Sequence, residues 1–402
     1  MSQIEKKNNG SNDSWQPETN VIRSQVPATT YREHATSIYM SSSFTFEDAE
    51  QARATFANEQ EGYIYSRYGN PNISEFIQKM CVLEGTESGL AVASGMSAVF
   101  SAVAGLLNSG DHILASRSLF SSTHQLLTRI LPRWGISHTY AEIASPEMWP
   151  ALIQPNTRLC LVETPSNPAL DLIDLTRLGE LCRARDIILL VDNVFATPIL
   201  QKPKQHGADL IMHSATKYID GQGRGIGGVL LGDKQLIEDV TYFVRHTGPS
   251  LSPFNAWMFS KSLETLPVRM ERHCQSAQEL AGWLEESATV SWVKYPHLAS
   301  HPQYELAKRQ MKLGGGMVTF GLKGGLEQGR RFLDALQLCS LTANLGDSRT
   351  IATHPASTTH SSLSEEERQA VGITPGLVRI STGLEHVDDI IADIARALGT
   401  SA

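Results

Sequence analysis

The sequence lacks long apolar runs, paired cysteines and any basic stripe, and each absence excludes a class of protein. No apolar stretch approaches the roughly 20 residues that cross a bilayer, so we expect no membrane partner. The net charge is −8 and lysines and arginines are dispersed, which argues against nucleic acid as a partner. The five cysteines are odd in number and form no Cys-x-x-Cys pair, so we expect buried thiols and no metal site.

The N-terminal stretch MSQIEKKNNGSNDSWQPE lacks the apolar segment of a signal peptide, and we expect a cytoplasmic protein. Its first 18 or so residues are polar and are expected to be disordered. Residues 1–70 as a whole are too polar and too rich in Pro, Ser and Thr to build a core of their own. We therefore interpret them as an arm that packs on something else.

From residue 73 onward, helical and strand-like patterns alternate. Apolar runs such as IILLV predict strands covered on both faces, and the helical segments between them are typical of βαβ units with a mostly parallel sheet. A long helical stretch at 256–287 then leads into mixed α+β sequence. The sequence predicts an α/β fold with a large domain at 71–264 and a smaller α+β domain at 265–402.

Residues that could bind a ligand through a side chain or a backbone N–H follow four of the predicted strands, at the strand ends where ligands bind in parallel α/β sheets. They are Gly95 and Met96 after GLAVA, Asn167 after LCLVE, Asp192 after IILLV, and Ser214, Thr216 and Lys217 after DLIMH. Taken singly, such residues are more often turn formers, helix caps or solvated charges. Their common location at one edge of a sheet favours a binding site.

Three chemistries could use the last of these segments, MHSATKYIDGQGRGIGG. A dinucleotide loop is disfavoured, because its G-x-G-x-x-G should open a helix and here it precedes another predicted strand. A serine acylase also needs an S-D-N element, which is missing, and its Ser-x-x-Lys should begin a helix. The third candidate, pyridoxal phosphate, uses every group.

Pyridoxal phosphate requires a lysine for its aldehyde, a carboxylate near its pyridine nitrogen, and donors for its phosphate. Lys217 provides the amine and Asp192 the carboxylate. The phosphate donors would be the helix N-terminus at Gly95 and Met96 and the hydroxyls of Ser214 and Thr216. Residues two apart in an extended segment point the same way, so Lys217 points oppositely to these hydroxyls, toward the aldehyde.

Seven ordered motifs resemble the Cys/Met-metabolism pyridoxal-phosphate enzymes. They are EGYIYSRYGNPN, SGMSA, ETPSNP, VDNVFATP, HSATKYIDGQGRGIGG, HPASTTH and LVRISTGLEHVDDI, and the likeness runs from about residue 20 to the C-terminus. The resemblance implies an aminotransferase-like fold of type I. It also implies a homotetramer built from dimers that share their active sites.

The resemblance assigns further roles around the cofactor. Asn167 would lie beside the phenolic oxygen, and Phe120 would stack on the ring. Tyr65 and Arg67, carried by the arm, would reach the phosphate bound to the neighbouring subunit. Together with Lys217, Tyr65 is a candidate for proton transfer.

The resemblance also assigns the substrate site. Arg379 would bind the substrate α-carboxylate, a bidentate task that suits a guanidinium, and Asn344 and Thr359 would lie near it. Where the lyases and cystathionine γ-synthase carry a stacking tyrosine, this sequence has Phe120, which cannot transfer a proton. Phe120 resembles most the O-succinylhomoserine sulfhydrylase branch of the family. The same resemblance is carried by the segments YREHATSIYMSSSF, VDNVFATP and ATKYIDGQGR.

The expected reaction is therefore a γ-replacement of methionine biosynthesis, in which O-succinyl-L-homoserine and sulfide give L-homocysteine and succinate. The alternatives within the family are O-acetylhomoserine sulfhydrylase, cystathionine γ-synthase and methionine γ-lyase. Phe120 disfavours the last two but does not distinguish the acetyl from the succinyl ester. An alternative of another class is a catalytically silent binding protein that retains pyridoxal phosphate.

Overall fold

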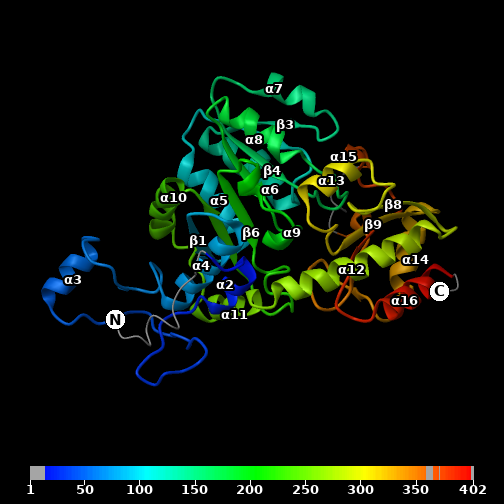
Figure 1. Cartoon of the computed structure of the whole chain (residues 1–402). Coiled ribbons are helices and arrows are strands. Elements are labelled where there is room, and N and C mark those ends of the chain that lie inside the picture. Colours follow the sequence, from blue (N-terminus) through cyan, green and yellow to red (C-terminus); the bar gives the residue numbers. More distant parts are fainter. Residues whose placement is uncertain (1–13, 359–364, 371, 400–402) are drawn as a thin grey trace. The chain divides into compact units, whose positions relative to one another are not determined.

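The computed structural model describes residues 14–358, 365–370 and 372–399. The chain divides into two compact units, coloured along the sequence in Figure 1. Unit 1 consists of Met1–Leu106, Met212–Thr216 and Arg224–Thr265, and unit 2 of Leu107–Ile211, Lys217–Gly223 and Leu266–Ala402. The domain boundaries expected at residues 71 and 265 stay a prediction.

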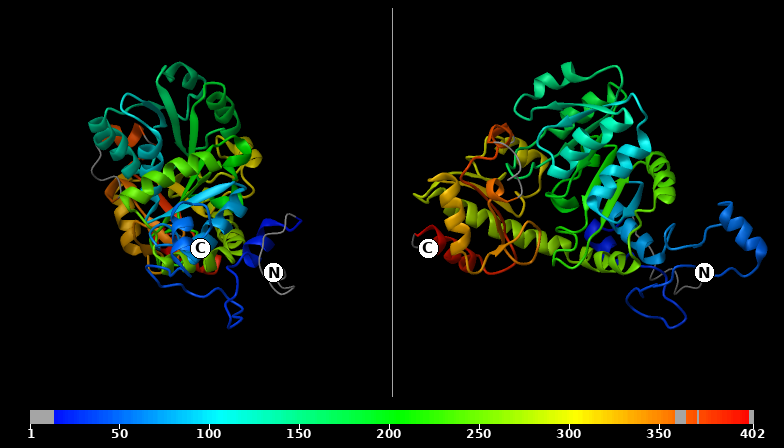
Figure 2. Two further views of the ribbon diagram at one scale, coloured as in Figure 1. Left: turned by 90° about the vertical axis from the view of Figure 1, so that its left-hand side faces the viewer. Right: turned by 180° about the vertical axis from the view of Figure 1, so that it is seen from behind.

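The described residues of unit 1 contain eight elements that lie wholly within it. They are α2 (Pro17–Arg23), α3 (Ala49–Phe56), α4 (Pro71–Glu84), β1 (Ser88–Val92), α5 (Gly95–Leu106), β7 (Gly228–Gly232), α10 (Lys234–Thr247) and α11 (Pro253–Leu263). Strands β1 and β7 pair antiparallel, and α4 packs on α11 while α5 packs on α10. In the right-hand view of Figure 2 the blue arm with α3 extends away from these packed helices.

Local chemistry defines the ends of α4. Pro71 occupies its first turn, where the missing N–H is no loss, and the side chain of Asn70 accepts a hydrogen bond from Asn72 N. Gly85 then ends the helix in the left-handed conformation, with φ at 74°. Helix α4 begins at Pro71, directly after the arm of residues 1–70, so Asn70 and Pro71 define where the arm joins the helices of unit 1.

Unit 2 carries a parallel group of strands in the order β5-β4-β2-β3. The elements of this first part are β2 (His112–Ser116), α6 (Ser121–Gln125), η1 (Leu126–Ile130), η2 (Leu131–Trp134), β3 (Ser137–Ala141), η3 (Pro146–Met148), α7 (Trp149–Leu152), β4 (Thr157–Glu163), α8 (Leu175–Arg183), β5 (Ile188–Asp192), α9 (Thr197–Leu200) and η4 (Pro203–His206). Strand β6 (Leu210–Ser214) leads from unit 2 into unit 1. The parallel order confirms the βαβ pattern predicted for this part of the sequence.

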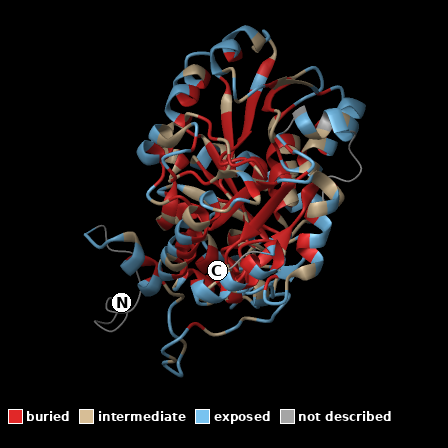
Figure 3. Ribbon diagram, turned by 90° about the vertical axis from the view of Figure 1, so that its right-hand side faces the viewer, coloured by how far each residue is buried: buried red, intermediate tan, exposed pale blue. Residues whose placement is uncertain are grey.

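The C-terminal part of unit 2 contains a five-stranded sheet in the order β10-β11-β12-β9-β8. Its elements are α12 (Leu266–Glu285), β8 (Val290–Lys294), α13 (Tyr304–Gln310), β9 (Met317–Leu322), α14 (Gly325–Ala335), β10 (Ser340–Leu341), β11 (Ile351–Thr353), η5 (Pro355–Ser357), α15 (Glu365–Ala370), β12 (Leu377–Ser381) and α16 (Val387–Leu398). Helix α16 packs on both α12 and α14, and the three helices share a continuous apolar core with the sheet. Figure 3 shows the buried residues gathered in the strands.

Two helical stretches of the sequence depart from a single continuous α-helix. The stretch 256–287 forms two helices, α11 and α12, because Pro267 starts a new first turn instead of continuing the old one. The stretch 121–135 leaves α geometry after Gln125 and continues as a π turn and a 3₁₀ turn, with Pro132 in the latter. Within the described ranges, no helix is both long and apolar enough to span a membrane.

Candidate active site

In unit 1, the N-terminus of α5 and the end of β6 form a narrow cradle. A Cβ atom added at Gly95 would lie 2.7 Å from Ser214 Cβ and 3.1 Å from Ser214 Oγ, so only glycine permits this approach. Ser94 caps the helix, its Oγ accepting a hydrogen bond from Ser97 N at 3.1 Å. The first-turn N–H groups of a helix have no intrahelical partner and attract anions. The cradle thus places Gly95, which precedes Met96 in the chain, directly against Ser214.

Thr216 extends the cradle toward the glycine-rich loop. Its Oγ1 accepts a hydrogen bond from Gly227 N at 3.3 Å, and Ala215 N donates to Gly227 O at 2.9 Å. A Cβ added at Gly228 would lie 2.1 Å from Ser94 O, so this glycine also allows a close backbone approach. Gly228, the last glycine of the G-x-G-x-x-G run, therefore has a packing role, because it lets two backbone segments meet beside Ser94.

In unit 2, Lys217 is partly buried and held by an amide. Its Nζ donates a hydrogen bond to Asn344 Oδ1 at 2.5 Å. Burial and then the Arg379 guanidinium lower the pKa of Lys217 to about 8, although the Asp192 carboxylate acts in the opposite direction. A lysine with a lowered pKa carries a larger fraction of the neutral amine, the form that attacks an aldehyde or removes a proton.

A loop packs directly against the backbone of this lysine. Gly346 has φ at 72°, and an added Cβ would lie 2.6 Å from Tyr218 N and 3.0 Å from Lys217 C. On the other side, the buried Arg269 donates to Tyr218 O at 2.6 Å. The backbone at Lys217 is therefore held from two directions. The sequence analysis assigned no role to Arg269 or Gly346.

Asp192 ends β5 and lies in register with Glu163, which ends β4. Its Oδ1 accepts a hydrogen bond from Val194 N at 3.1 Å. Directly opposed residues of neighbouring strands have side chains about 5 Å apart, so two carboxyl groups share this strand end. The strand-end pattern in the sequence predicts a role for Asp192, whereas Glu163 is a site residue that the structure reveals. The signal was present, since a glutamate closes the apolar run LCLVE.

Glu163 is buried and binds the backbone of the predicted ring-stacking residue. Its Oε2 accepts a hydrogen bond from Phe120 N at 2.8 Å. Burial and then the Asp192 carboxylate raise the pKa of Glu163 well above its ordinary value. Hydrogen bonds from the backbone N–H groups of Phe120 and Asn167 lower this pKa but do not outweigh those two effects. The phenyl ring of Phe120 is itself exposed and available for stacking.

We expect the raised pKa of Glu163 to make folding stability fall as pH rises. Above the ordinary value of 4.5 the unfolded state loses this proton while the folded state keeps it, so stability declines until pH passes the folded pKa. The neutral Glu163→Gln lacks this effect. Its stability relative to wild type should therefore rise by up to about 1.4 kcal/mol per pH unit above that value, measured by urea unfolding.

The exposed Glu238→Gln is the matched control, and its free energy of unfolding should change with pH in the same way as that of wild type. Parallel stability curves for Glu163→Gln and wild type would show that Glu163 ionises normally in the folded protein.

Arg379 lies on β12 in register with Thr353 of β11 and is buried, with 3% of its surface exposed. One terminal nitrogen donates to Asn167 Oδ1 at 2.9 Å, and the other to Asn344 O at 3.2 Å. Its Nε has no partner in the described part of the chain. Burial lowers the pKa of Arg379 to about 10, against the effects of Tyr218 and Glu163.

These contacts make unit 2 suited to an anionic substrate. A buried guanidinium whose hydrogen bonds are all to neutral groups is costly, and a carboxylate would satisfy its remaining N–H. Asn344 serves both ends of this arrangement, with its side chain on Lys217 and its backbone oxygen on Arg379. Asn167 contacts Arg379 as well as lying after β4. Thr359 falls outside the described residues.

The arm residues make contacts of their own within unit 1. The Arg67 guanidinium lies 4.7 Å from the ring centre of Tyr68 and 5.4 Å from that of Tyr65, and it also donates to Arg245 O. Tyr65 joins Ser43 in an isolated β-bridge. Tyr65 is 40% exposed, so its hydroxyl-bearing ring is available to another molecule.

Comparison with known proteins places these features in a family. A model of the family described as "Cys/Met metabolism PLP-dependent enzyme" matches residues 18–399. An O-succinylhomoserine sulfhydrylase of Pseudomonas aeruginosa is 47% identical over 95% of this chain and 94% of its own length. One of Mycobacterium tuberculosis is 44% identical over 94% of each chain. An L-methionine gamma-lyase of Porphyromonas gingivalis is 44% identical over 90% of this chain and 92% of its own.

Solved structures agree on the fold. A putative O-acetylhomoserine (thiol)-lyase of Campylobacter jejuni superposes with a TM-score of 0.92 at 34% identity, covering 96% of this chain and all of that one. Its lysine carries pyridoxyl phosphate. The structure named metB from Corynebacterium glutamicum gives a TM-score of 0.90 at 34% identity, covering 97% and 99%. The predicted fold of type I is confirmed.

Proposed function

The chain belongs to the Cys/Met metabolism PLP-dependent enzymes, and from that membership we propose that it is an O-succinylhomoserine sulfhydrylase. Hydrosulfide would displace succinate from Cγ of O-succinyl-L-homoserine, so that a C–S bond forms, a C–O bond breaks and L-homocysteine is released. The observation that carries this choice is the identity of 47% and 44%, over nearly the whole chain, to relatives with that name.

The residues of each unit fit part of the cofactor. The Gly95–Ser214 cradle in unit 1 offers N–H and hydroxyl donors of the kind that hold a phosphate. Unit 2 offers a lysine amine with lowered pKa, at Lys217, and a carboxylate, Asp192. Thr216 and Lys217 are consecutive, which supports the proposal that both sets serve one cofactor. Bound there, pyridoxal phosphate supplies an electron sink for negative charge at the substrate α-carbon.

We assign the remaining steps to the chain's own side chains. Arg379 binds the α-carboxylate through its unpartnered Nε–H, which orients the α-proton for removal. Lys217 Nζ removes that proton and returns one, and Asn344 Oδ1 holds the amine in place. Succinate leaves as a carboxylate and needs no proton. This suits a site with Phe120, which has no proton to give.

We also propose that Tyr65 and Arg67 complete the site of a neighbouring subunit in a homotetramer. Support comes from the arm, where Tyr31, Met40 and Phe56 are 91%, 69% and 62% exposed and offer apolar side chains that a neighbouring subunit would cover. Inactive Lys217→Ala and Arg67→Ala chains, refolded together, should regain activity, because one hybrid site then has both residues. Activity no higher than that of the separate variants would contradict a shared site.

A comparison of products tests the reaction. Purified protein receives O-succinyl- or O-acetyl-L-homoserine, each with sulfide or with cysteine, and homocysteine and cystathionine are measured side by side. We expect homocysteine from the succinyl ester and sulfide at the highest kcat/KM. Cystathionine as the main product would assign the chain to the γ-synthase branch, and a preference for the acetyl ester would overturn the choice of substrate.

A further inference from the structure

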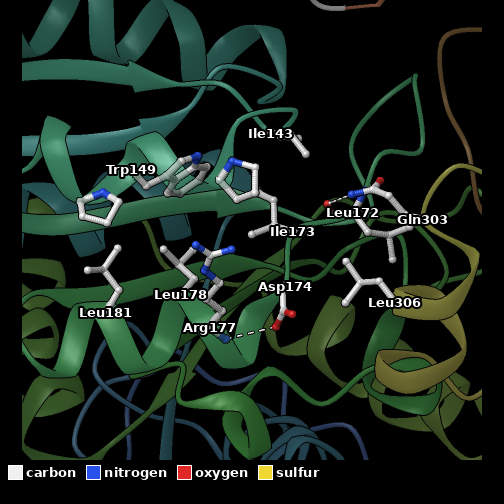
Figure 4. A pocket seen from close by; sticks show the side chains of 12 residues that line it. Ile143, Trp149, Leu172, Ile173, Asp174, Arg177, Leu178, Leu181, Gln303 and Leu306 are labelled. Atoms are coloured by element: carbon white, nitrogen blue, oxygen red, sulfur yellow. Dashed lines mark hydrogen bonds between the residues drawn. The ribbon is translucent and has the colours of Figure 1, made fainter.

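A second cavity, of about 270 Å³, lies in unit 2 and shares no residue with the site described above. Its walls are Trp149 of α7, Leu178 of α8, Leu306 of α13 and the extended residues Leu172 and Ile173. Figure 4 shows these side chains converging from three segments that are far apart in sequence. The lining is mostly apolar, which favours an apolar ligand body.

Two polar side chains in the lining, those of Trp149 and Gln303, form hydrogen bonds with the protein backbone. Trp149 Nε1 donates to Glu142 O at 2.9 Å, so the indole presents carbon to the cavity. Both atoms of the Gln303 amide bond the backbone of Leu172, at 2.7 Å and 2.5 Å. The indole N–H is therefore not available to a ligand, and the Gln303 amide, held by the backbone, is neutral.

The lining contains two charged side chains, Asp174 and Arg177, and only Asp174 has a partner of opposite charge in the described part of the chain. Asp174 accepts hydrogen bonds from Arg177 N at 3.1 Å and from the Arg309 side chain at 2.8 Å, so its charge is compensated by Arg309. The guanidinium of Arg177 has no hydrogen bond or ion pair among the residues that the structure describes. Figure 4 shows it rising into the cavity beneath Trp149. The cavity therefore has one uncompensated cation and no free anion.

We propose that this cavity binds a small monocarboxylic acid with an apolar body, whose carboxylate pairs with Arg177. A planar guanidinium fork matches a carboxylate, and the leucine and tryptophan walls exclude water from the remainder of the ligand. Binding sites for drug-sized ligands span about 300–1,000 Å³, so this smaller volume excludes nucleotides and suits about a dozen heavy atoms. One uncompensated cation and no uncompensated anion disfavour dianions and zwitterions.

Calorimetric titration of the holoenzyme with 4-phenylbutanoate tests the proposal, with the uncharged 4-phenylbutanamide as the matched ligand. We expect the acid to bind at least about tenfold more tightly than the amide, the loss expected for one charge-assisted pair. Arg177→Gln should remove this preference and Arg177→Lys should retain part of it. Arg177 is exposed on α8, so both variants should fold. Leu306→Trp, which fills the cavity, should abolish binding of both ligands.

The visible absorption of the cofactor distinguishes this cavity from the substrate site. Binding in the cavity should leave the band unchanged, whereas a carboxylate bound at Arg379 should perturb it. The proposal is wrong if wild type does not bind the acid, if the amide binds equally well, if Arg177→Gln binds the acid as tightly as wild type, or if binding perturbs the band.

Discussion

Lys217→Ala is expected to lower turnover by about 10⁴-fold or more, because it removes the covalent anchor and the proton-transfer group together. The visible absorption of the lysine-linked cofactor should disappear as well. Steady-state kinetics with O-succinyl-L-homoserine and sulfide, together with the absorption spectrum, measure both effects. Normal turnover in this variant would refute the role of Lys217 and, with it, the proposed chemistry.

Two further substitutions separate the roles of Lys217. Lys217→Arg keeps a positive charge beside Asn344 but cannot act as a base or form the covalent link, so it should be as inactive as the alanine variant. The exposed Lys312→Ala is the control for loss of a lysine elsewhere and should retain wild-type kinetics and spectrum. An active Lys217→Arg would mean that charge, and not the amine, is what the site requires.

The parallel part of the fold could be read from the sequence because its signals are local. Strands β2, β4 and β5 are continuous apolar runs, and such runs predict strands covered on both faces. Once the strands are parallel, their carboxyl ends share one edge, which is why Asp192 and Asn167 were predicted together. The sequence predicts one helical stretch at 256–287, whereas the structure has two helices between residues 253 and 285. The strong helical periodicity hides the boundary, although a proline within such a pattern marks the first turn of a new helix, as Pro267 does here.

The contacts that adjust the site could not be read from the sequence. The hydrogen bond from Phe120 N to Glu163 joins residues 43 positions apart in sequence, and that from Lys217 to Asn344 joins residues 127 positions apart. Such pairs depend on strand register and on how a distant loop packs, and a single sequence contains no periodicity that encodes either. The resemblance located Asn344 near the substrate, but only the structure shows its hydrogen bond to the lysine amine. Burial, which governs the pKa of Glu163, is likewise a property of the packed chain.

Arg379→Gln has the second largest expected effect, because this guanidinium is buried and has no carboxylate partner among the residues that the structure describes. Its hydrogen bonds go to Asn167 Oδ1, Asn344 O and Thr353 Oγ1, which are all neutral, so a carboxylate from the substrate is the partner we expect. Removing one partner of a buried charge pair costs roughly 2–5 kcal/mol, which corresponds to about 30- to 5,000-fold in kcat/KM. Folding should be little affected, since burying an unpaired cation does not stabilise a protein.

A substrate analogue without the α-carboxylate, the O-succinyl ester of 3-aminopropan-1-ol, shows whether that group is the partner. Wild type should discriminate strongly between the substrate and this analogue, and Arg379→Gln should discriminate weakly, so that the two changes are not additive. If the losses simply add, Arg379 acts elsewhere, for instance by holding Asn167. Because Arg379 pairs in register with Thr353 and Thr319 on neighbouring strands, its position is set by the five-stranded sheet and not by a loop. A rigid cation of this kind can select one orientation of the substrate and thereby decide which proton Lys217 removes.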